Sequence, residues 1–369
     1  MIRICAIARR LESCAKALTI TGVSALLAGC SAVVLAPAGD VAAQQRDLLV
    51  ISVVLMLLII IPVMVLIVWF AWRYRESNKE ATYAPDWDHS TKLELVIWAV
   101  PLLIIICLGA VTWLGTHMLD PYRPISRIAS DRAVNPAVKP LEVEVVALDW
   151  KWLFLYPEYG VATVNDMAAP VDRPIVFKIT ASSVMNSFYI PALAGQIYAM
   201  PGMETKLHAV INAPGVYDGF SANYSGAGFS GMRFKFHGLS GGGFDRWIAE
   251  ARASDRTLDS ATYLDLLKPS ENVPVTRFAD VEPGLYTAAL NMCVAPGAPC
   301  MNDIMAKDMR AAAGHVTADH HAPPPTVRFS APALSTTQPI AGAGLVPPAE
   351  QARIARSAKA LSAQDRQPL

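Results

Sequence analysis

Six cysteines carry the most reactive side chains of this sequence, and their spacing decides which chemistry they can perform. No Cys-x-x-Cys pair occurs, so the sequence supports neither a zinc ribbon nor a thioredoxin-like redox motif. Each cysteine therefore needs its own interpretation. The six positions are Cys5, Cys14, Cys30, Cys107, Cys293 and Cys300.

Cys30 follows the small and apolar residues Leu27-Ala28-Gly29, which is the layout of a bacterial lipobox. In a lipobox the cysteine receives a lipid and becomes the first residue of the mature protein. Basic residues and an apolar stretch over 17–28 precede it, as in a secretory signal. We therefore predict a signal peptide with a lipobox over 1–29 and lipidation at Cys30. The alternatives are a plain signal sequence and an uncleaved anchor.

Cys293 and Cys300 are separated by a short loop that contains Gly297 and two prolines. If this part of the chain is exported, both thiols lie in an oxidising compartment, where disulfides persist. The spacing permits a bridge when the two Cα atoms come within about 7 Å of each other. We expect a disulfide here, and we interpret Cys107, inside an apolar segment, as a small apolar filler.

Methionine and histidine side chains near the C-terminus offer soft and borderline ligands of the kind that bind copper. They precede or lie within a segment rich in Ala, Pro, Ser and Thr, with Pro323-Pro324-Pro325 and little apolar periodicity. We predict a disordered tail over 311–369 and assign these side chains no metal. The isolated His117, His208 and His237 also receive no chemistry. The late residues are Met301, Met305, Met309, His315, His320 and His321.

The composition is typical of a membrane protein. Of the 369 residues, 53% are hydrophobic and 17% are charged, and the mean hydropathy is +0.34. These values lie well to the apolar side of ordinary globular domains. The 31 Lys and Arg residues balance the 31 Asp and Glu residues. A chain without net charge has no long-range basic field for a phosphate backbone, which argues against nucleic acid as a partner.

Two uncharged runs, over 48–72 and 95–118, predict transmembrane helices. At about 1.5 Å per residue the first run spans roughly 37 Å, enough to cross a hydrocarbon core of ~30 Å with some tilt. The loop 73–94 carries more basic residues than the segment before the first run, which favours a cytoplasmic loop. With an exported N-terminal segment over 30–47, the chain crosses twice and places everything from 119 onward outside.

The chain changes character beyond the second span. Between 141 and 156 polar and apolar residues alternate, and the aromatic residues from Trp150 to Tyr156 share one parity, which predicts one long strand with an aromatic face. We expect these aromatic side chains to pack in a core or an interface. Further strand-like runs indicate an all-β sandwich or barrel over 119–240, followed by a helical extension over 241–310. The predicted strands are 175–180, 205–211, 216–220 and 231–237, and the predicted helices are 244–253 and 260–267.

The run Asp149-Trp150-Lys151-Trp152-Leu153-Phe154-Leu155-Tyr156-Pro157, placed after two membrane spans, resembles the subunit II family of the haem–copper respiratory oxidases. The resemblance covers most of the predicted mature chain, from roughly 47 to 290. It implies a two-helix transmembrane hairpin followed by an all-β cupredoxin-like Greek-key barrel with short C-terminal helices. In the cytochrome c oxidase branch of this family, the barrel holds a dinuclear copper centre that accepts electrons from cytochrome c.

The family builds that copper centre from a histidine on an early loop and a run of the form Cys-x-Glu-x-Cys-x-x-x-His-x-x-Met. The run from Ser221 to Met232 keeps this spacing but not the side chains. One thioether cannot hold copper, and a serine hydroxyl does not replace a thiolate, so we expect a domain without metal. The flanking Pro191-Ala192-Leu193 and Pro201-Gly202-Met203 remain. Loss of the whole ligand set between intact flanks resembles the quinol oxidase branch of the family. The matching positions are Asn186 for the early histidine, then Ser221, Asn223, Ser225, Phe229 and Met232.

That branch implies a subunit of a proton-pumping complex in the bacterial plasma (inner) membrane, which oxidises ubiquinol and reduces oxygen to water. The expected partners are oxidase subunit I, which carries the haems and copper, smaller membrane subunits and membrane lipid, but neither cytochrome c nor nucleic acid. This chain would hold no cofactor and would place its C-terminal domain in the periplasm. One alternative is a cytochrome c oxidase subunit II, against which the missing copper ligands argue. A second is a membrane-anchored copper chaperone, which would not need a two-span hairpin. A third is a purely structural interaction protein.

Glu94 directly precedes the second uncharged run, at the cytoplasmic end of the second span. A negative charge in the first turn of a helix is stabilised by about 0.3–1 kcal/mol, so helix capping explains this residue without a further role. In the family, an acid at the matching place stands at the mouth of a proton pathway into subunit I. The resemblance therefore implies a role in proton uptake for Glu94.

Overall fold

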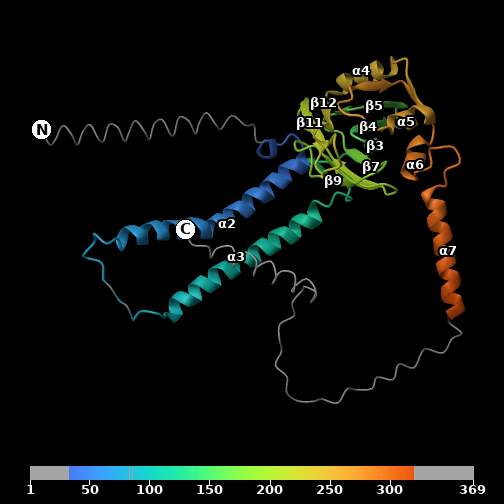
Figure 1. Ribbon diagram of the computed structural model, residues 1–369. Coiled ribbons are helices and arrows are strands. Elements are labelled where there is room, and N and C mark those ends of the chain that lie inside the picture. Colours follow the sequence, from blue (N-terminus) through green and yellow to red (C-terminus); the bar gives the residue numbers. More distant parts are fainter. Residues whose placement is uncertain (1–32, 83, 85, 320–369) are drawn as a thin grey trace, which may run out of the picture. The chain divides into compact units, whose positions relative to one another are not determined.

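The computed structural model describes residues 33–82, 84 and 86–319, and Figure 1 traces its helices and strands. The predicted signal peptide and the lipidation site Cys30 lie outside the described residues, as does the predicted tail beyond 319. The first described element is a short 3-10 helix, η1 (Val33–Leu35).

Two long apolar helices run beside each other before the β domain (Figure 1). α2 (Asp40–Arg73) and α3 (Thr91–Met118) are long and apolar enough to cross a membrane, and their most apolar windows have mean hydropathies of 3.3 and 2.7. Most of their large apolar side chains are exposed, as expected for a surface that faces lipid or a membrane partner. α2 begins before the uncharged run because the polar residues at its start, such as Gln44 and Gln45, are good helix formers.

The start of α2 is held against the β domain. The backbone N–H groups of Ala38 and Gly39 both donate to the carbonyl oxygen of Ala192, each over 2.9 Å. Arg127 Nε donates to Oδ2 of the buried Asp40 over 2.9 Å. The membrane hairpin and the β domain are therefore joined by specific contacts at this end of α2.

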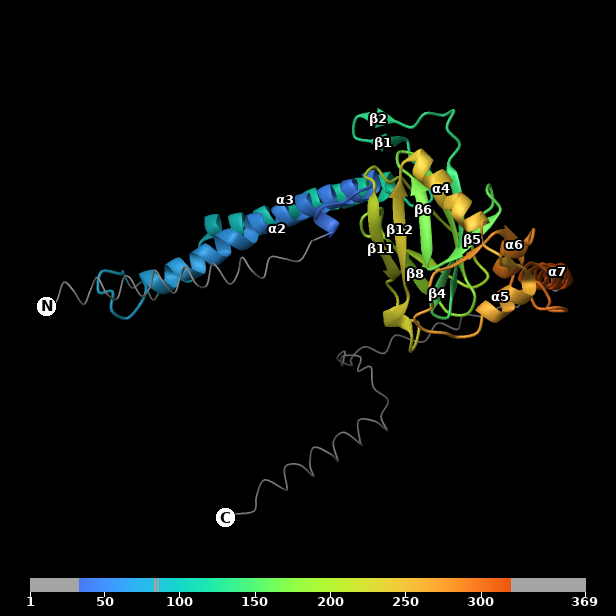
Figure 2. The ribbon, with the colours of Figure 1, turned by 90° about the horizontal axis from the view of Figure 1, so that it is seen from above.

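Two β-sheets face each other and enclose the main hydrophobic core (Figure 2). The strand order is β10-β7-β3-β4-β5-β14 in the larger sheet and β6-β12-β11-β8-β9 in the smaller one. Only β3–β7 and β12–β6 are parallel pairs within these two sheets of the described chain. This cupredoxin-like sandwich confirms the predicted all-β fold. The larger sheet contains β3 (Leu141–Leu148), β4 (Lys151–Tyr156), β5 (Val161–Val164), β7 (Ile175–Ala181), β10 (Thr205–Ala209) and β14 (Thr276–Phe278). The smaller sheet contains β6 (Asp166–Pro170), β8 (Asn186–Tyr189), β9 (Ile197–Ala199), β11 (Gly215–Ser221) and β12 (Arg233–Leu239). Two short strand pairs are formed by β1 (Arg127–Ala129) with β2 (Arg132–Ala133) and by β13 (Thr257–Leu258) with β15 (Asp280–Val281).

Aromatic side chains from both sheets meet in the core. Trp152 of β4 makes an edge contact with Phe188 of β8, and Phe188 stacks on Phe234 of β12, with centroid distances of 5.4 Å in both pairs. Such a pair stabilises the fold by about 0.5–1.5 kcal/mol beyond its area burial. Gly219 lies beneath Phe234, where an added Cβ would come within 2.1 Å of the ring, so this position needs a glycine.

The predicted single strand over 141–156 is wrong, because the segment is a hairpin. β3 ends at Leu148, β4 starts at Lys151, and these two residues pair across the turn. The turn moves the core-facing positions from odd numbers in β3, such as Val145, to even numbers in β4, such as Trp152. The shared parity of the aromatic residues therefore applies to β4 alone and does not extend back into β3. Trp150 lies in the turn and leaves the aromatic face, whereas Trp152 stays in the core.

The C-terminal extension covers the outer face of the larger sheet. Leu153 and Leu155 of β4 belong to a second hydrophobic cluster with Tyr263, Phe278 and Tyr286 of the extension. β4 is therefore buried on both faces. Of the helices in this extension, α4 and α5 correspond to the two that the sequence predicted. The helices are α4 (Gly241–Arg252), α5 (Ser260–Leu266) and α6 (Leu285–Leu290).

Asp166 joins the extension to the smaller sheet through a buried carboxylate. Its oxygens accept hydrogen bonds from Trp247 Nε1 of α4 (3.2 Å) and from Arg277 Nη2 of β14 (3.5 Å). His237 Nε2 of β12 lies 2.7 Å from the same carboxylate. Since an unpaired buried carboxylate is costly, these partners stabilise the docking of α4 onto the sandwich.

The last described helix, α7 (Met301–Asp319), extends past 311, where the disordered tail was predicted to begin. Alanine has the highest helix propensity, so Ala311-Ala312-Ala313 continue the helix although their composition is of low complexity. The prediction of disorder is therefore wrong for 311–319. The chain divides into two units within this helix, after Ala311.

Candidate functional site

Three of the positions that match the copper spacing come together between two paired strands. Asn186 begins β8, and Ser221 ends the neighbouring β11. The Ser221 hydroxyl donates a hydrogen bond to Asn186 Oδ1 over 3.1 Å, and both side chains are buried. The carbonyl oxygen of Met232 accepts from the Ser221 backbone N–H over 3.2 Å, and the Met232 side chain is also buried.

The other three positions lie in the loop between β11 and β12. Asn223 Nδ2 donates to the carbonyl oxygen of Met185 over 3.0 Å, which joins this loop to the one before β8. Phe229 lines a hollow of about 340 Å³ together with Ser221. Ser225 lies between them in the same loop. The spacing in the sequence thus identified two loops that the fold does bring into contact.

The side chains present in these loops do not fit a dinuclear copper centre. Such a centre needs thiolate and imidazole ligands, whereas these positions supply hydroxyl and amide groups, one phenyl ring and one thioether. Asn186 and Ser221 use their polar atoms on each other and on backbone carbonyls. In the part of the chain that the structure describes, no group of three or more His, Cys, Asp or Glu residues could hold a metal ion.

Trp150 packs against the same loop from the side of the larger sheet. Its indole N–H donates to the carbonyl oxygen of Ser225 over 2.9 Å, and the ring lies against Gly226 and Gly228. An added Cβ on Gly228 would come within 2.6 Å of the ring, so the close approach requires glycine. Next to it, burial lowers the pKa of the Lys151 ammonium, which donates to backbone carbonyls. The turn is thus fixed by packing and hydrogen bonds.

Glu94 lies in the first turn of α3 and is remote from these loops, since a helix of 28 residues is about 42 Å long. Its Oε1 lies 2.7 Å from Nδ1 of His89, whose Nε2 lies 3.1 Å from the Thr91 hydroxyl oxygen. The Glu94 and His89 side chains are 48% and 61% exposed. A carboxylate in contact with an exposed imidazole can exchange a proton with it and with water. The sequence analysis missed His89, although a histidine just before an acid at the start of a span could have signalled it.

Cys293 and Cys300 form a disulfide in the structure, with their Cα atoms 4.8 Å apart. The bridge lies between α6 and α7, and the carbonyl of Cys300 accepts the first hydrogen bonds of α7 from Asp303 and Ile304. It therefore ties the start of α7 to the extension. Cys107 is a free thiol on the exposed surface of α3.

Comparison with known proteins finds relatives over most of the described chain. Residues 158–237 match the family of the cytochrome c oxidase subunit II periplasmic domain, and residues 252–297 match the COX aromatic-rich motif. A cytochrome bo(3) ubiquinol oxidase subunit 2 of Pseudomonas putida is 52% identical over 71% of this chain and 80% of its own length. A ubiquinol oxidase subunit 2 of Acetobacter aceti is 51% identical over 71% of this chain and 82% of its own. A solved periplasmic domain of cytochrome oxidase subunit II of Bradyrhizobium japonicum is 21% identical over 30% of this chain and 91% of its own, with a TM-score of 0.29.

Proposed function

Because the chain belongs to the subunit 2 family of ubiquinol oxidases, we propose that it serves in a ubiquinol:oxygen oxidoreductase as a membrane-anchored subunit without a redox centre of its own. The observation that carries this proposal is the pair of loops around Asn186 and Ser221. They keep the spacing of a copper site, but their polar atoms bind each other and nearby carbonyls. An electron donor that dissolves in the membrane makes an electron acceptor in the exported domain unnecessary.

The proposal assigns the electron-transfer chemistry to the partner subunits. Subunit I would hold the haems and the copper, and the complex would oxidise ubiquinol and reduce oxygen to water in the bacterial plasma membrane. α2 and α3 would anchor this chain beside subunit I and smaller membrane subunits, with the β domain in the periplasm. Cytochrome c would not be a partner, since the β domain would offer it no metal centre.

Purification of the complex from its native membrane tests this function. We expect the chain to copurify with a haem-bearing subunit and the sample to consume oxygen with ubiquinol but not with reduced cytochrome c. The chain, once separated from its partners, should contain no copper in metal analysis. Isolation without a haem protein would contradict the proposal, as would oxygen consumption driven by cytochrome c.

A second part of the proposal concerns proton uptake at the cytoplasmic start of α3. The Glu94 carboxylate binds His89 rather than a backbone N–H, so helix capping by a hydrogen bond is not what orients it. The exposed Glu94 carboxylate is accessible to water, and its place at the start of α3 would put it next to a partner subunit that packs on α2 and α3. We assign the pair of Glu94 and His89 to proton delivery toward the partner subunit.

Processing at Cys30 is the third part of the proposal. The lipobox layout predicts that the mature chain starts at this residue and carries acyl chains there. Intact-mass analysis of the purified protein should show the loss of residues 1–29 and an added acyl mass. In Cys30→Ser the added mass should disappear while the complex still assembles, because two spans anchor the chain without lipid. A mature protein that starts at Met1 would contradict this prediction.

A further inference from the structure

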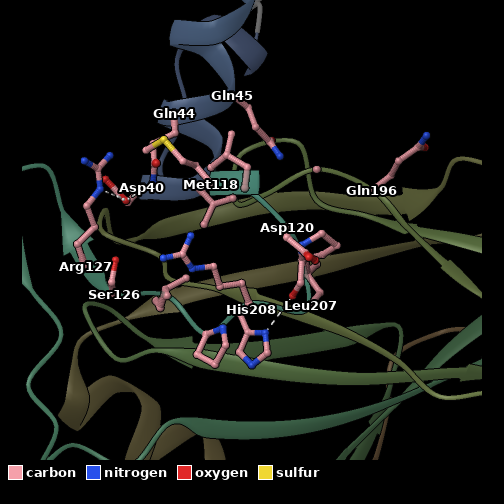
Figure 3. A pocket seen from close by; sticks show the side chains of 17 residues that line it. Asp40, Gln44, Gln45, Met118, Asp120, Ser126, Arg127, Gln196, Leu207 and His208 are labelled. Carbon is pink, nitrogen blue, oxygen red and sulfur yellow. Dashed lines mark hydrogen bonds and ion pairs between the residues drawn. The ribbon is translucent and has the colours of Figure 1, made fainter. Parts of the chain in front are cut away.

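A polar cavity lies where the membrane hairpin meets the β domain, and nothing in the proposed function uses it. It has a volume of about 490 Å³ and is enclosed by the start of α2, the segment after α3 and strand β10. In Figure 3, Gln44, Gln45 and Met118 lie on the helix side of the hollow, and Leu207 and His208 lie across from them. The cavity is therefore formed jointly by the two parts of the fold.

Its position along the helices is that of lipid headgroups. The apolar run of α2 begins at 48 and α3 ends at Met118, so Gln44 and Asp120 lie just beyond the hydrocarbon core on the side of the β domain. Phospholipid phosphates lie in this interfacial region of the bilayer. A cavity at this depth can receive a headgroup without removing the lipid from its leaflet.

The charges left over in the cavity are one cation and one anion. The buried Asp40 is already neutralised by Arg127 (2.9 Å) and accepts from Gln44 Nε2 (2.7 Å). Arg123 belongs to no ion pair among the described residues, and its guanidinium donates only weakly, over 3.4 Å, to a backbone carbonyl. Asp120 uses one carboxylate oxygen on a backbone N–H. A ligand that carries both an anion and a cation complements this pair.

A second, apolar hollow of about 480 Å³ continues from the cavity into the membrane between α2 and α3. Gln45 lines both spaces, which places them next to each other. Leu48 and Gly115 line this hollow where the helices approach each other, and an added Cβ on Gly115 would come within 2.7 Å of Leu48. Ser52 and Thr112 line it as well, and their small side chains leave room for an acyl chain.

We propose that these two hollows bind one phospholipid with a phosphoethanolamine headgroup. Its phosphate would bind the Arg123 guanidinium, its primary ammonium would donate to the Asp120 carboxylate, and one acyl chain would lie in the groove beside Ser52. A primary ammonium has three N–H donors, whereas the quaternary ammonium of a choline lipid has none, and a glycerol headgroup has no cation. The proposal rests on the membrane orientation of the proposed function.

Native mass spectrometry of the complete oxidase complex tests this site, with added phosphatidylethanolamine as the probe. We expect one such lipid to bind the wild-type complex, and its affinity to fall about tenfold in Arg123→Gln, through loss of a charge-assisted bond, and in Ser52→Trp, through filling of the groove. The exposed residues Arg246 and Val54 line neither hollow, so Arg246→Gln and Val54→Trp are the matched controls and should bind as wild type. In Asp120→Asn, which retains an oxygen for the backbone N–H, the preference for phosphatidylethanolamine over phosphatidylcholine should disappear.

Equal lipid binding by wild type, Arg123→Gln and Ser52→Trp would overturn the proposal. So would equal affinity of the wild type for phosphatidylglycerol or phosphatidylcholine, because the charge pair would then select nothing. If the wild-type complex binds no lipid that is absent from Arg123→Gln and Ser52→Trp, the proposal is wrong and side chains of a partner subunit fill the space. Haem content and ubiquinol-dependent oxygen consumption of the same samples report the proposed function separately.

Discussion

Replacement of five loop residues by the ligands of the copper-binding branch is expected to convert a chain that binds no copper into one that binds a pair of copper ions. The Asn186 and Ser221 side chains are already 3.1 Å apart, and Met232 is adjacent through the backbone. The new thiolates and imidazoles would therefore converge in one place, as soft ligation of copper requires. The substitutions are Asn186→His, Ser221→Cys, Asn223→Glu, Ser225→Cys and Phe229→His.

Metal analysis and the intense thiolate-to-copper absorption of the purified full chain measure this result. The matched control carries the substitutions at 186, 223 and 229 but keeps both serines, and it should bind no copper pair because it lacks the bridging thiolates. Phe229→His places a polar ring where an apolar one packs, so we expect some loss of stability without metal. A folded variant that takes up no copper would show that these loops do not correspond to the family's ligand loops. Tight binding of copper by the wild type would contradict the proposed function.

Ubiquinol-dependent oxygen consumption is expected to fall several-fold in Glu94→Gln, with assembly and haem content unchanged. Glutamine keeps the size and the hydrogen-bonding capacity of the side chain, but it cannot take up and release a proton at neutral pH. The contact of 2.7 Å with His89 can persist, so the change removes proton transfer with little change in structure. Oxygen consumption by the purified complex, together with its haem spectrum, measures this effect.

Two further variants define what that result means. Glu80→Gln removes an exposed acid from the segment between α2 and α3 and should leave turnover unchanged. His89→Gln keeps a hydrogen bond to Glu94 but removes the imidazole that can pass a proton, so it should lower turnover less than Glu94→Gln does. Normal turnover in Glu94→Gln would leave this acid with its role at the helix N-terminus alone.

Local patterns in the sequence were sufficient to predict those helices and strands whose surroundings stay the same along their length. The runs 48–72 and 95–118 predict the membrane helices because lipid surrounds a spanning helix on nearly every side, and hydropathy reports this directly. Strands β10 and β12 alternate because one face meets the core and the other is more exposed. The spacing from Ser221 to Met232 likewise located one loop of the site, since residues within a loop stay close whatever the rest of the chain does.

The burial of β4 on both faces depended on partners distant in sequence. In the sequence, Leu153 and Leu155 look like ordinary strand residues. The face of β4 that they form is buried only because the C-terminal extension packs over it. The same extension supplies Trp247, one of the donors that hold the buried Asp166.

The pair of His89 with Glu94 and the cavity at Arg123 also had to come from the three-dimensional structure. Each is made of side chains whose positions depend on how a helix starts or on where α2 meets β10. Sequence alone predicted two apolar helices long enough to span a membrane and an all-β domain after them, and it located loops with the wrong donors for copper. Tertiary structure decided which polar groups face each other, because pairing between remote segments is set by packing of the whole sandwich and leaves no periodic trace in either segment.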